Sequence, residues 1–251
     1  DLSIGDARFS DFAGSSIVHS AGGWAALMGA VFLGPRIGKY GPDGKPRAIP
    51  GHNVGFAVVG VFVLWFGWFG FNAGSELAMD NWVAHCIMTT LLAGSAGVVG
   101  AGAAIWRKTG AMDVGMAGNG ALAGLVSITA GTGTMSFAGS VAVGFIGGVI
   151  VVYSVLFIER RGIDDPVGAV SVHGVCGAWG TLAIGFFARH DDAFLGRDDA
   201  GLFYGGGFDQ LLVQAIGVVI VAVWVLGTTA ILFKVLKSTV GLRVSAEEEL
   251  A

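Results

Sequence analysis

The chain has 251 residues, of which 54% are hydrophobic and only 13% charged, and 44 are glycine. Soluble domains carry about 25% charged residues, so these proportions exclude an ordinary soluble protein and favour a polytopic helical membrane protein, in which glycine allows helices to approach closely. The net charge of -4 comes without a basic stripe, which excludes nucleic-acid binding, and the two cysteines lie in apolar runs, which implies no disulfide framework.

Seven apolar stretches are long enough, or nearly so, to cross a hydrocarbon layer of about 30 Å as helices. We expect them near residues 11–34, 53–75, 82–106, 112–131, 137–158, 166–188 and 209–236. The fourth stretch is the shortest and the richest in glycine. The pattern predicts an all-α polytopic membrane protein, with a membrane domain over residues 1–236 and a cytoplasmic tail over 237–251.

Charge indicates the orientation of this domain. When the stretches are alternated across the membrane, 11 of the 14 Lys and Arg residues fall on one side, in the loops at 35–52, 107–111 and 159–165 and in the tail after 233. Only Arg8, Arg189 and Arg197 fall on the other side. The positive-inside rule then places the N-terminus of the chain outside and its C-terminus in the cytoplasm. The longest outer loop, at 189–208, is acidic and rich in glycine.

The first residues, Asp1 to Arg8, are polar and contain no signal peptide. We expect either that the first apolar stretch acts as its own signal anchor or that the chain is a fragment. Pairs of glycines four residues apart predict small-residue helix contacts at Gly70/Gly74, Gly120/Gly124 and Gly144/Gly148.

Two histidines lie deep in apolar stretches within the same local pattern. Residues 14–23 and 168–177 both read Gly-x-x-x-Val-His-x-x-x-Gly. A single membrane histidine is ordinarily explained by a helix–helix hydrogen bond, but the repeated pattern favours a shared function. The two stretches cross in opposite senses, as in inverted repeats whose sites lie near the midplane. We therefore expect His19 and His173 to meet at the centre of a pore for a neutral substrate or a proton.

The end of the second stretch, residues 65–75, combines aromatic and small polar residues. An aromatic belt at the membrane surface accounts for Trp65 and Trp68. It does not account for the hydroxyl of Ser75 so close to Phe71. A hydroxyl beside an aromatic face binds a small ammonium-type cation by a hydrogen bond and cation–π attraction. We expect an outer cation site there, leading to a narrower aromatic gate.

Two other polar residues have alternative interpretations. Asp11, at the outer end of the first stretch, either caps that helix or gives cation selectivity at the pore mouth. Cys176 lies three residues after His173, on a similar helix face, so a metal site with both histidines is conceivable. No fourth ligand is suggested, and we expect no metal and no cofactor.

These residues resemble the ammonium transporter family, Amt/Mep/Rh, and its Amt branch more than Rh. The resemblance extends over essentially the whole chain and is carried by residues 11–19, 65–75, 121–126, 172–175 and 241–245. The family implies eleven helices, ten of them in two inverted five-helix repeats, in a homotrimer with one pore per subunit. The stretches found here correspond to helices five to eleven, and the N-terminal four helices have no counterpart.

The resemblance also implies roles for individual residues. Ser75 is similar to the hydroxyl of the outer ammonium site and Phe71 to one of two stacked gate phenylalanines. His19 and His173 are similar to the twin pore histidines, and Asp11 to the acidic residue near the outer vestibule. The expected activity is uptake of ammonium or ammonia through the plasma membrane, with a PII-type signal protein as a candidate cytosolic regulator.

Other functions compete with this interpretation. Seven spans with the N-terminus outside is also the topology of seven-helix receptors. A retinal protein of this kind needs a lysine deep in the last span. The lysines of that span, Lys234 and Lys237, lie at its end. An ammonium sensor on the same fold stays open. A purely structural subunit leaves the repeated histidine motif unexplained. No hydrolytic or redox constellation is present, so we do not expect an enzyme.

Overall fold

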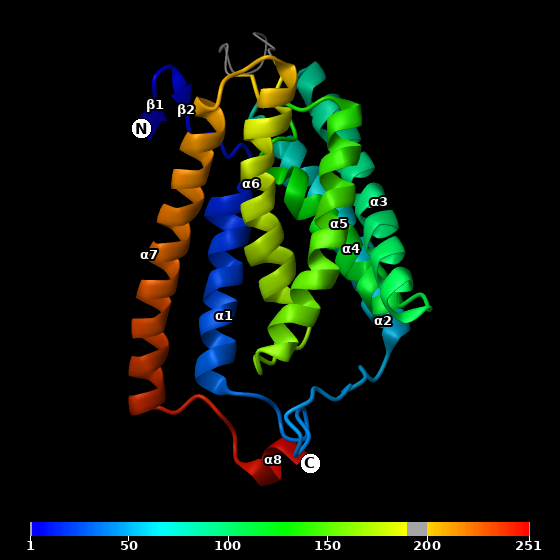
Figure 1. Ribbon diagram of the computed structural model, residues 1–251, viewed down its shortest axis with the longest axis vertical. Helices are drawn as coiled ribbons and strands as arrows, with labels where there is room; N and C mark the ends of the chain where they lie inside the picture. Colours follow the sequence, from blue (N-terminus) through cyan, green and yellow to red (C-terminus); the bar gives the residue numbers. More distant parts are fainter. Residues whose placement is uncertain (1, 190–199, 251) are drawn as a thin grey trace.

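The computed structural model describes residues 2–189 and 200–250 as a bundle of long helices with the two chain ends at opposite ends of the bundle (Figure 1). In this part of the chain the helical elements are η1 (Ser15–Ser20), α1 (Ala21–Leu33), α2 (Val54–Gly74), α3 (Asn81–Thr109), α4 (Val114–Thr129), α5 (Phe137–Arg160), η2 (Val170–Val175), α6 (Cys176–Phe187), η3 (Leu202–Tyr204), α7 (Asp209–Thr239) and α8 (Ala246–Leu250). The predicted all-α class is confirmed. Part of the predicted outer loop at 189–208, with Arg197, lies outside the described residues.

Several helices begin at a capping side chain that is readable in the sequence. Asn53, Asp80, Asp113 and Ser136 each precede a helix, and each accepts a hydrogen bond from a backbone N–H group of its first turn. These bonds satisfy N–H groups that have no partner inside the helix. α3 ends at Gly110, which adopts the left-handed conformation common after a helix.

Six helices among the described residues are long and apolar enough to cross a membrane, counting η1 with α1 and η2 with α6. α4 is the exception, because its 16 residues are shorter than the predicted stretch at 112–131 and extend about 24 Å. Its residues from Gly120 onward are almost all buried, and the turn at 130–135 that follows is buried too. A helix enclosed by protein need not match the thickness of the lipid.

Glycine sets the close packing of α3, α4 and α5. A Cβ atom added at Gly120 or Gly144 would collide with α3 at Gly97 or Ala93. The pairs at 120/124 and 144/148 therefore form the predicted small-residue contacts. The third pair does not. Gly70 and Gly74 have open space around the position of a Cβ atom, so this motif makes no helix contact among the described residues.

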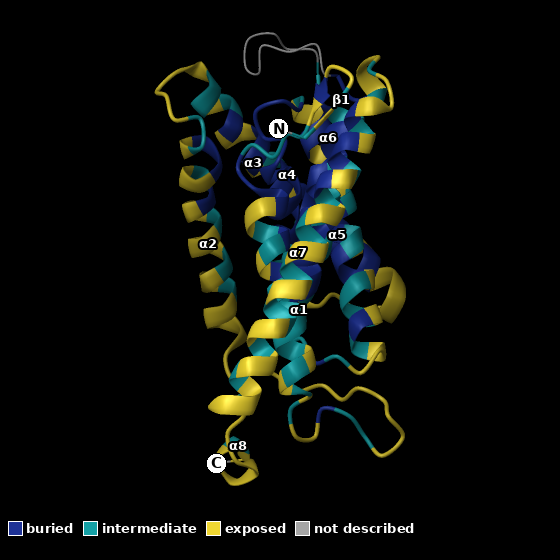
Figure 2. Ribbon diagram, turned by 90° about the vertical axis from the view of Figure 1, so that its left-hand side faces the viewer, coloured by how far each residue is buried: buried dark blue, intermediate teal, exposed yellow. Residues whose placement is uncertain are grey.

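α2 and α7 are apolar helices whose side chains are mostly exposed (Figure 2). Phe66 on α2 and Trp224 on α7, for example, are 79% and 70% exposed. Large apolar side chains on the outside of a bundle suit a hydrocarbon environment and not water. The exposed surface thus agrees with the polytopic membrane class.

A small β-hairpin, which the sequence did not predict, precedes the helices. β1 (Ser3–Ile4) pairs antiparallel with β2 (Ala7–Arg8). After it, the ring of Phe9 occupies the space left by Gly217 on α7. The hairpin and the residues that follow are thereby held against the N-terminal half of α7.

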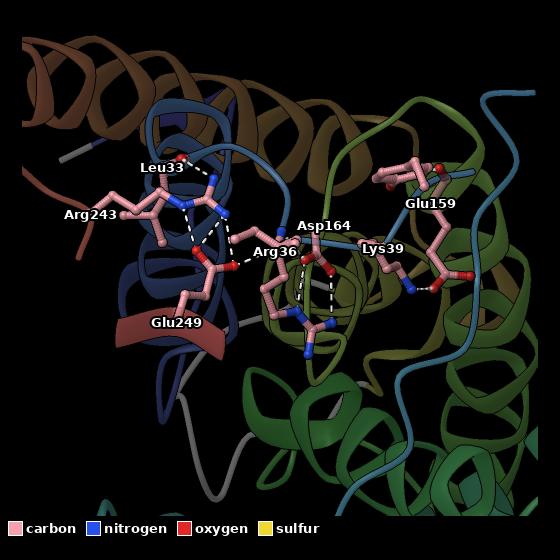
Figure 3. A network of polar contacts seen from close by, with 9 residues as sticks. Leu33, Arg36, Lys39, Glu159, Asp164, Arg243 and Glu249 are labelled. Atoms are coloured by element: carbon pink, nitrogen blue, oxygen red, sulfur yellow. Dashed lines mark hydrogen bonds and ion pairs between the residues drawn. The ribbon is translucent and has the colours of Figure 1, made fainter. Parts of the chain in front are cut away.

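Ion pairs connect the loops at the opposite end of the bundle (Figure 3). Arg36, after α1, contacts Asp164 with its side chain at 2.8 and 2.9 Å and with its backbone N–H at 2.9 Å. Lys39 is only 6% exposed and pairs with Glu159 at the end of α5. In the tail, Arg243 pairs with Glu249 at 2.7 Å. The first two contacts join the loop after α1 to the end of α5 and to the loop that follows it, and the third lies within the tail.

Candidate functional site

Each of the two deep histidines lies in a π-helical turn that leads into a regular helix. η1 contains His19 and continues as α1, and η2 contains His173 and continues as α6. π-helical turns are rare and are frequent at functional sites. The repeated sequence motif thus corresponds to a repeated and unusual backbone structure.

Asp11 organises the chain in front of the first of these turns. Its Oδ2 accepts hydrogen bonds from the backbone N–H groups of Ser16 and Ile17, at 3.0 and 2.8 Å. Gly14, between them, has a φ of 105°, a left-handed value that glycine adopts without steric cost. The bonds are those of a helix cap, one of the two roles considered for Asp11, while its Oδ1 has no hydrogen-bond partner among the described residues.

Asp165, which the sequence analysis missed, has the same place before the second turn. It accepts hydrogen bonds from the backbone N–H groups of Ala169 and Val170 at 2.9 and 2.7 Å. Gly168 again has a positive φ, of 76°. The signal was present in the sequence, because Asp165 precedes His173 by the same eight residues that separate Asp11 from His19. The repeated motif therefore begins three residues earlier, at the aspartate.

The two turns cross where neither backbone has room for a larger residue. A Cβ atom at Gly23 would collide with the backbone of Gly174, and one at Gly177 with the carbonyl oxygen of Ser15. The hydroxyl of Ser20 donates a hydrogen bond to the carbonyl of Gly174 at 2.9 Å. Gly23 and Gly177 are the last glycines of the two copies of the motif. Their lack of a side chain lets the two turns touch.

This crossing brings the two imidazoles together. The Nδ1 atoms of His19 and His173 are 3.3 Å apart, and the rings stack with centroids 5.3 Å apart and planes 24° from parallel. A hydrogen bond between two Nδ1 atoms needs one donor and one acceptor, so two neutral rings must be in opposite tautomers. In that case one Nε2 atom of the pair is a donor and the other is an acceptor.

Trp68 and Phe71 of α2 cover His19. The indole of Trp68 stacks on the imidazole at 4.8 Å, and the ring of Phe71 lies 5.5 Å away at a tilt. Trp68 is 7% exposed, and its Nε1 donates to Thr129 Oγ1 at 3.0 Å. The interpretation of Trp68 as part of a surface aromatic belt is therefore wrong. Periodicity places it on α2 but does not show which neighbour it faces.

Ser75 lies one turn beyond Phe71, at the end of α2. Its hydroxyl donates a hydrogen bond to the carbonyl of Phe71 at 2.8 Å. The lone pairs of the hydroxyl oxygen stay available to a donor. Along α2, the predicted outer site at Ser75, the predicted gate at Phe71 and the histidine pair thus follow one another.

Cys176 contacts the neighbouring helix α5. Its thiol lies 3.5 Å from the carbonyl oxygen of Gly147 and is completely buried. Within residues 2–189 and 200–250, no three His, Cys, Asp or Glu side chains are close enough to hold a metal ion.

Comparison with known proteins gives a consistent set of relatives. A sequence profile of the Ammonium Transporter Family matches residues 3–251. The ammonium transporter Amt2 of Archaeoglobus fulgidus is 49% identical over 245 residues, which are 96% of this chain and 52% of the relative. Ammonium transporter 1 member 2 of Oryza sativa subsp. japonica is 38% identical over 258 residues, with the same coverage of 96% and 52%.

Solved structures of similar fold agree with these sequence relatives. A protein described as Sensor Amt Protein superposes with a TM-score of 0.90 at 40% identity, over 97% of this chain and 58% of that chain. Candida albicans Mep2 superposes with a TM-score of 0.80 at 32% identity, over 94% of this chain and 52% of that chain. The chain thus spans about half the length of the curated relatives it matches.

Proposed function

Because the chain belongs to the Ammonium Transporter Family, we propose that it mediates passage of ammonium or ammonia across the cell membrane at the His19–His173 pair. The observation that carries this proposal is the Nδ1–Nδ1 contact of 3.3 Å between two turns of the same sequence motif. The curated relatives compared above are named ammonium transporters, which are transport proteins and not enzymes.

The mechanism begins with capture of ammonium at the outer side. Ser75 accepts a hydrogen bond from the cation, and Phe71 attracts it through the face of its ring. A bare cation is costly to move through an apolar pore. Ammonium therefore gives its proton to water near Phe71, passes His19 and His173 as ammonia, and takes up a proton from water on the inner side. Potassium has a similar size but no proton to lose, so the same barrier excludes it.

Neutral ammonia fits the hydrogen-bonding character of the pair. It has one lone pair and three N–H groups, so it accepts from the Nε2–H of one histidine and donates to the bare Nε2 of the other. Asp11, near the outer end of η1, caps that turn and contributes negative charge on the outer side. The path of the released proton decides whether transport moves charge.

We further propose that this domain lies in the plasma membrane with its N-terminus outside, as a homotrimer with one pore per subunit. The positive-inside distribution supports this orientation, and family membership supports the trimer. Orientation is testable by cysteine labelling. A membrane-impermeant maleimide should label Met79→Cys, at an exposed site before α3, on intact cells, and Lys45→Cys only after permeabilisation. The reverse pattern would place the C-terminal tail outside.

Transport itself is tested by His173→Ala. Ammonium uptake by cells lacking their own transporters should fall steeply, or its selectivity over potassium should be lost, while the protein still reaches the membrane. His52→Ala, in the exposed loop before α2, is the matched control and should leave uptake unchanged. Unchanged uptake and selectivity in His173→Ala would contradict a role of His173 in the pore.

The runner-up is an ammonium sensor on the same fold, which the likeness to the Sensor Amt Protein favours. A sensor binds ammonium without carrying a comparable flux. Binding measured by calorimetry with no uptake in the same preparation would support the sensor. Regulation by a PII-type protein at the basic inner loops is a related proposal, to be checked by co-purification.

A further inference from the structure

α7 is buried along one short face near its N-terminus, and further along it packs less closely against α1, where Phe233 stacks on Phe32. Of its 31 residues, only Gln210, Val213, Gln214 and Gly217 are buried. They are spaced as neighbours on one side of a helix. Two of these four are glutamines in an otherwise apolar helix, and an amide without partners is unfavourable in such surroundings. The hydrogen bonds of these two glutamines therefore identify the segments that this face of α7 binds.

Gln214 is completely buried and binds the chain ahead of η1. Its Oε1 accepts a hydrogen bond from the backbone N–H of Ser10 at 2.8 Å, and its Nε2 donates to the carbonyl of Ser10 at 2.6 Å. The side-chain amide thus pairs with this residue as a neighbouring strand would. Nε2 also donates to the carbonyl of Thr181 on α6 at 3.0 Å.

Thr181 carries this connection on to the turn that contains His19. Its hydroxyl lies 2.6 Å from the hydroxyl of Ser16, and both groups are completely buried. Asp11, the residue after Ser10, holds the backbone N–H of Ser16. The segment from Ser10 to Ser16 is therefore fixed at its first residue by α7 and at its last residue by α6, three residues before His19.

We propose that Gln214 is a positioning residue for the histidine pair. By holding Ser10 against Thr181, it sets the place of η1 relative to η2 and so the contact between His19 and His173. In this way the side-chain amide of Gln214 on α7 influences the position of the pore histidines. The effect on transport rests on the proposed function, whereas the effect on the two rings does not.

The test replaces Gln214 by methionine, which has similar length but cannot form these hydrogen bonds. The protein is purified in lipid nanodiscs with isotope-labelled histidine. We expect the through-space cross-peak between the His19 and His173 rings to be lost in solid-state NMR spectra. Maximal ammonium uptake should fall about tenfold, because small misplacement of a reacting group is costly. The half-saturating concentration should stay the same, because Ser75 and Phe71 lie on α2.

A second pair of variants keeps the proposal testable if Gln214→Met does not fold. Thr181→Val removes the hydroxyl at nearly constant shape, and Thr181→Ser retains it. The cross-peak should be lost in the first variant and present in the second. Thr228→Val is the control on α7, because the Thr228 hydroxyl is exposed and bonds only to carbonyl oxygens of α7 itself, those of Trp224 and Val225. It should retain the cross-peak.

Failure of the positioning role of Gln214 and failure of the transport proposal give different results. A cross-peak that persists in Thr181→Val and in folded Gln214→Met would overturn the positioning role, whatever their uptake. If the unmodified protein carries no ammonium while the variants still lose the cross-peak, the transport proposal fails and the positioning role stands.

Discussion

The carboxylates of Asp11 and Asp165 act on the histidine pair through the backbone. Each accepts two N–H groups near the start of a π-helical turn, and the imidazole follows within that turn. N–H groups at the start of a helix have no partner within it, so a fixed carboxylate both satisfies them and sets the direction of the turn. Side chains that never face the substrate can in this way decide where His19 and His173 lie.

Asp165→Ala should lower stability by about 1 kcal/mol, the usual effect of removing a helix-capping acceptor. Asp165→Asn should lower it less, because one acceptor oxygen remains. The melting temperature in detergent measures both changes. Asp43→Ala, in the exposed loop after α1, is the control and should have little effect. Equal melting temperatures for Asp165→Ala and the unmodified protein would mean that η2 does not depend on this carboxylate.

At the scale of the elements, the site depends on how closely the two turns cross. Gly23 and Gly177 lie at equivalent places in the repeated motif, directly after the two turns, and each touches the backbone of the other turn. The imidazoles meet because their backbones can approach this closely. A helix pair with larger residues at the crossing would hold the two rings further apart.

Gly23→Ala should therefore destabilise the protein by about 1–3 kcal/mol, since the new methyl group would collide with the backbone at Gly174. It should also move His19 away from His173 and reduce uptake. Gly22→Ala is the matched control, because no atom lies within 4 Å of its Cβ position. Unfolding of both variants in detergent provides the comparison. Equal stability of the two variants would contradict a role of the crossing, because alanine raises helix propensity at both positions.

At the scale of the whole molecule, an ion pair connects the two segments that carry the histidines. Arg36 follows α1, and Asp164 directly precedes Asp165 and η2, so their contact joins the end of the first segment to the start of the second. The hydrogen bonds from Arg36 hold the pKa of the Asp164 carboxyl below its usual range, against the opposing effect of burial. The contact is made by the ionised carboxylate.

The lowered pKa of Asp164 determines how this residue makes the stability of the protein depend on pH. A lowered pKa in the folded state means that unfolding takes up a proton, so the contribution of Asp164 is complete above the unfolded pKa of about 3.9. It is lost as the pH falls through the lower folded pKa. Asp164→Asn should be less stable than the unmodified protein near neutral pH, with a smaller further loss below about pH 4. Melting temperatures across pH test this, with Asp43→Asn as control; parallel curves would contradict it.

Features that depend on local composition can be predicted from the sequence. Apolar runs specify helices for a membrane because an unpaired backbone is unfavourable in lipid. The glycine pairs of α4 and α5 and the repeated motif around His19 and His173 were also visible, as were the residues that carry the family resemblance. That family is confirmed by the match over residues 3–251. The eight-residue spacing that identifies Asp165 is also present in the sequence.

Which side chains meet depends on how the helices pack, and this is not predicted by the sequence. Trp68 faces His19 and not the membrane surface, Gly70 and Gly74 face open space, and Gln214 binds Ser10, 204 residues away in sequence. Periodicity assigns a residue to a face of its helix, but the partner of that face depends on how the other helices pack. The contact between His19 and His173 likewise depends on packing, because it forms where two segments distant in sequence cross at glycine residues.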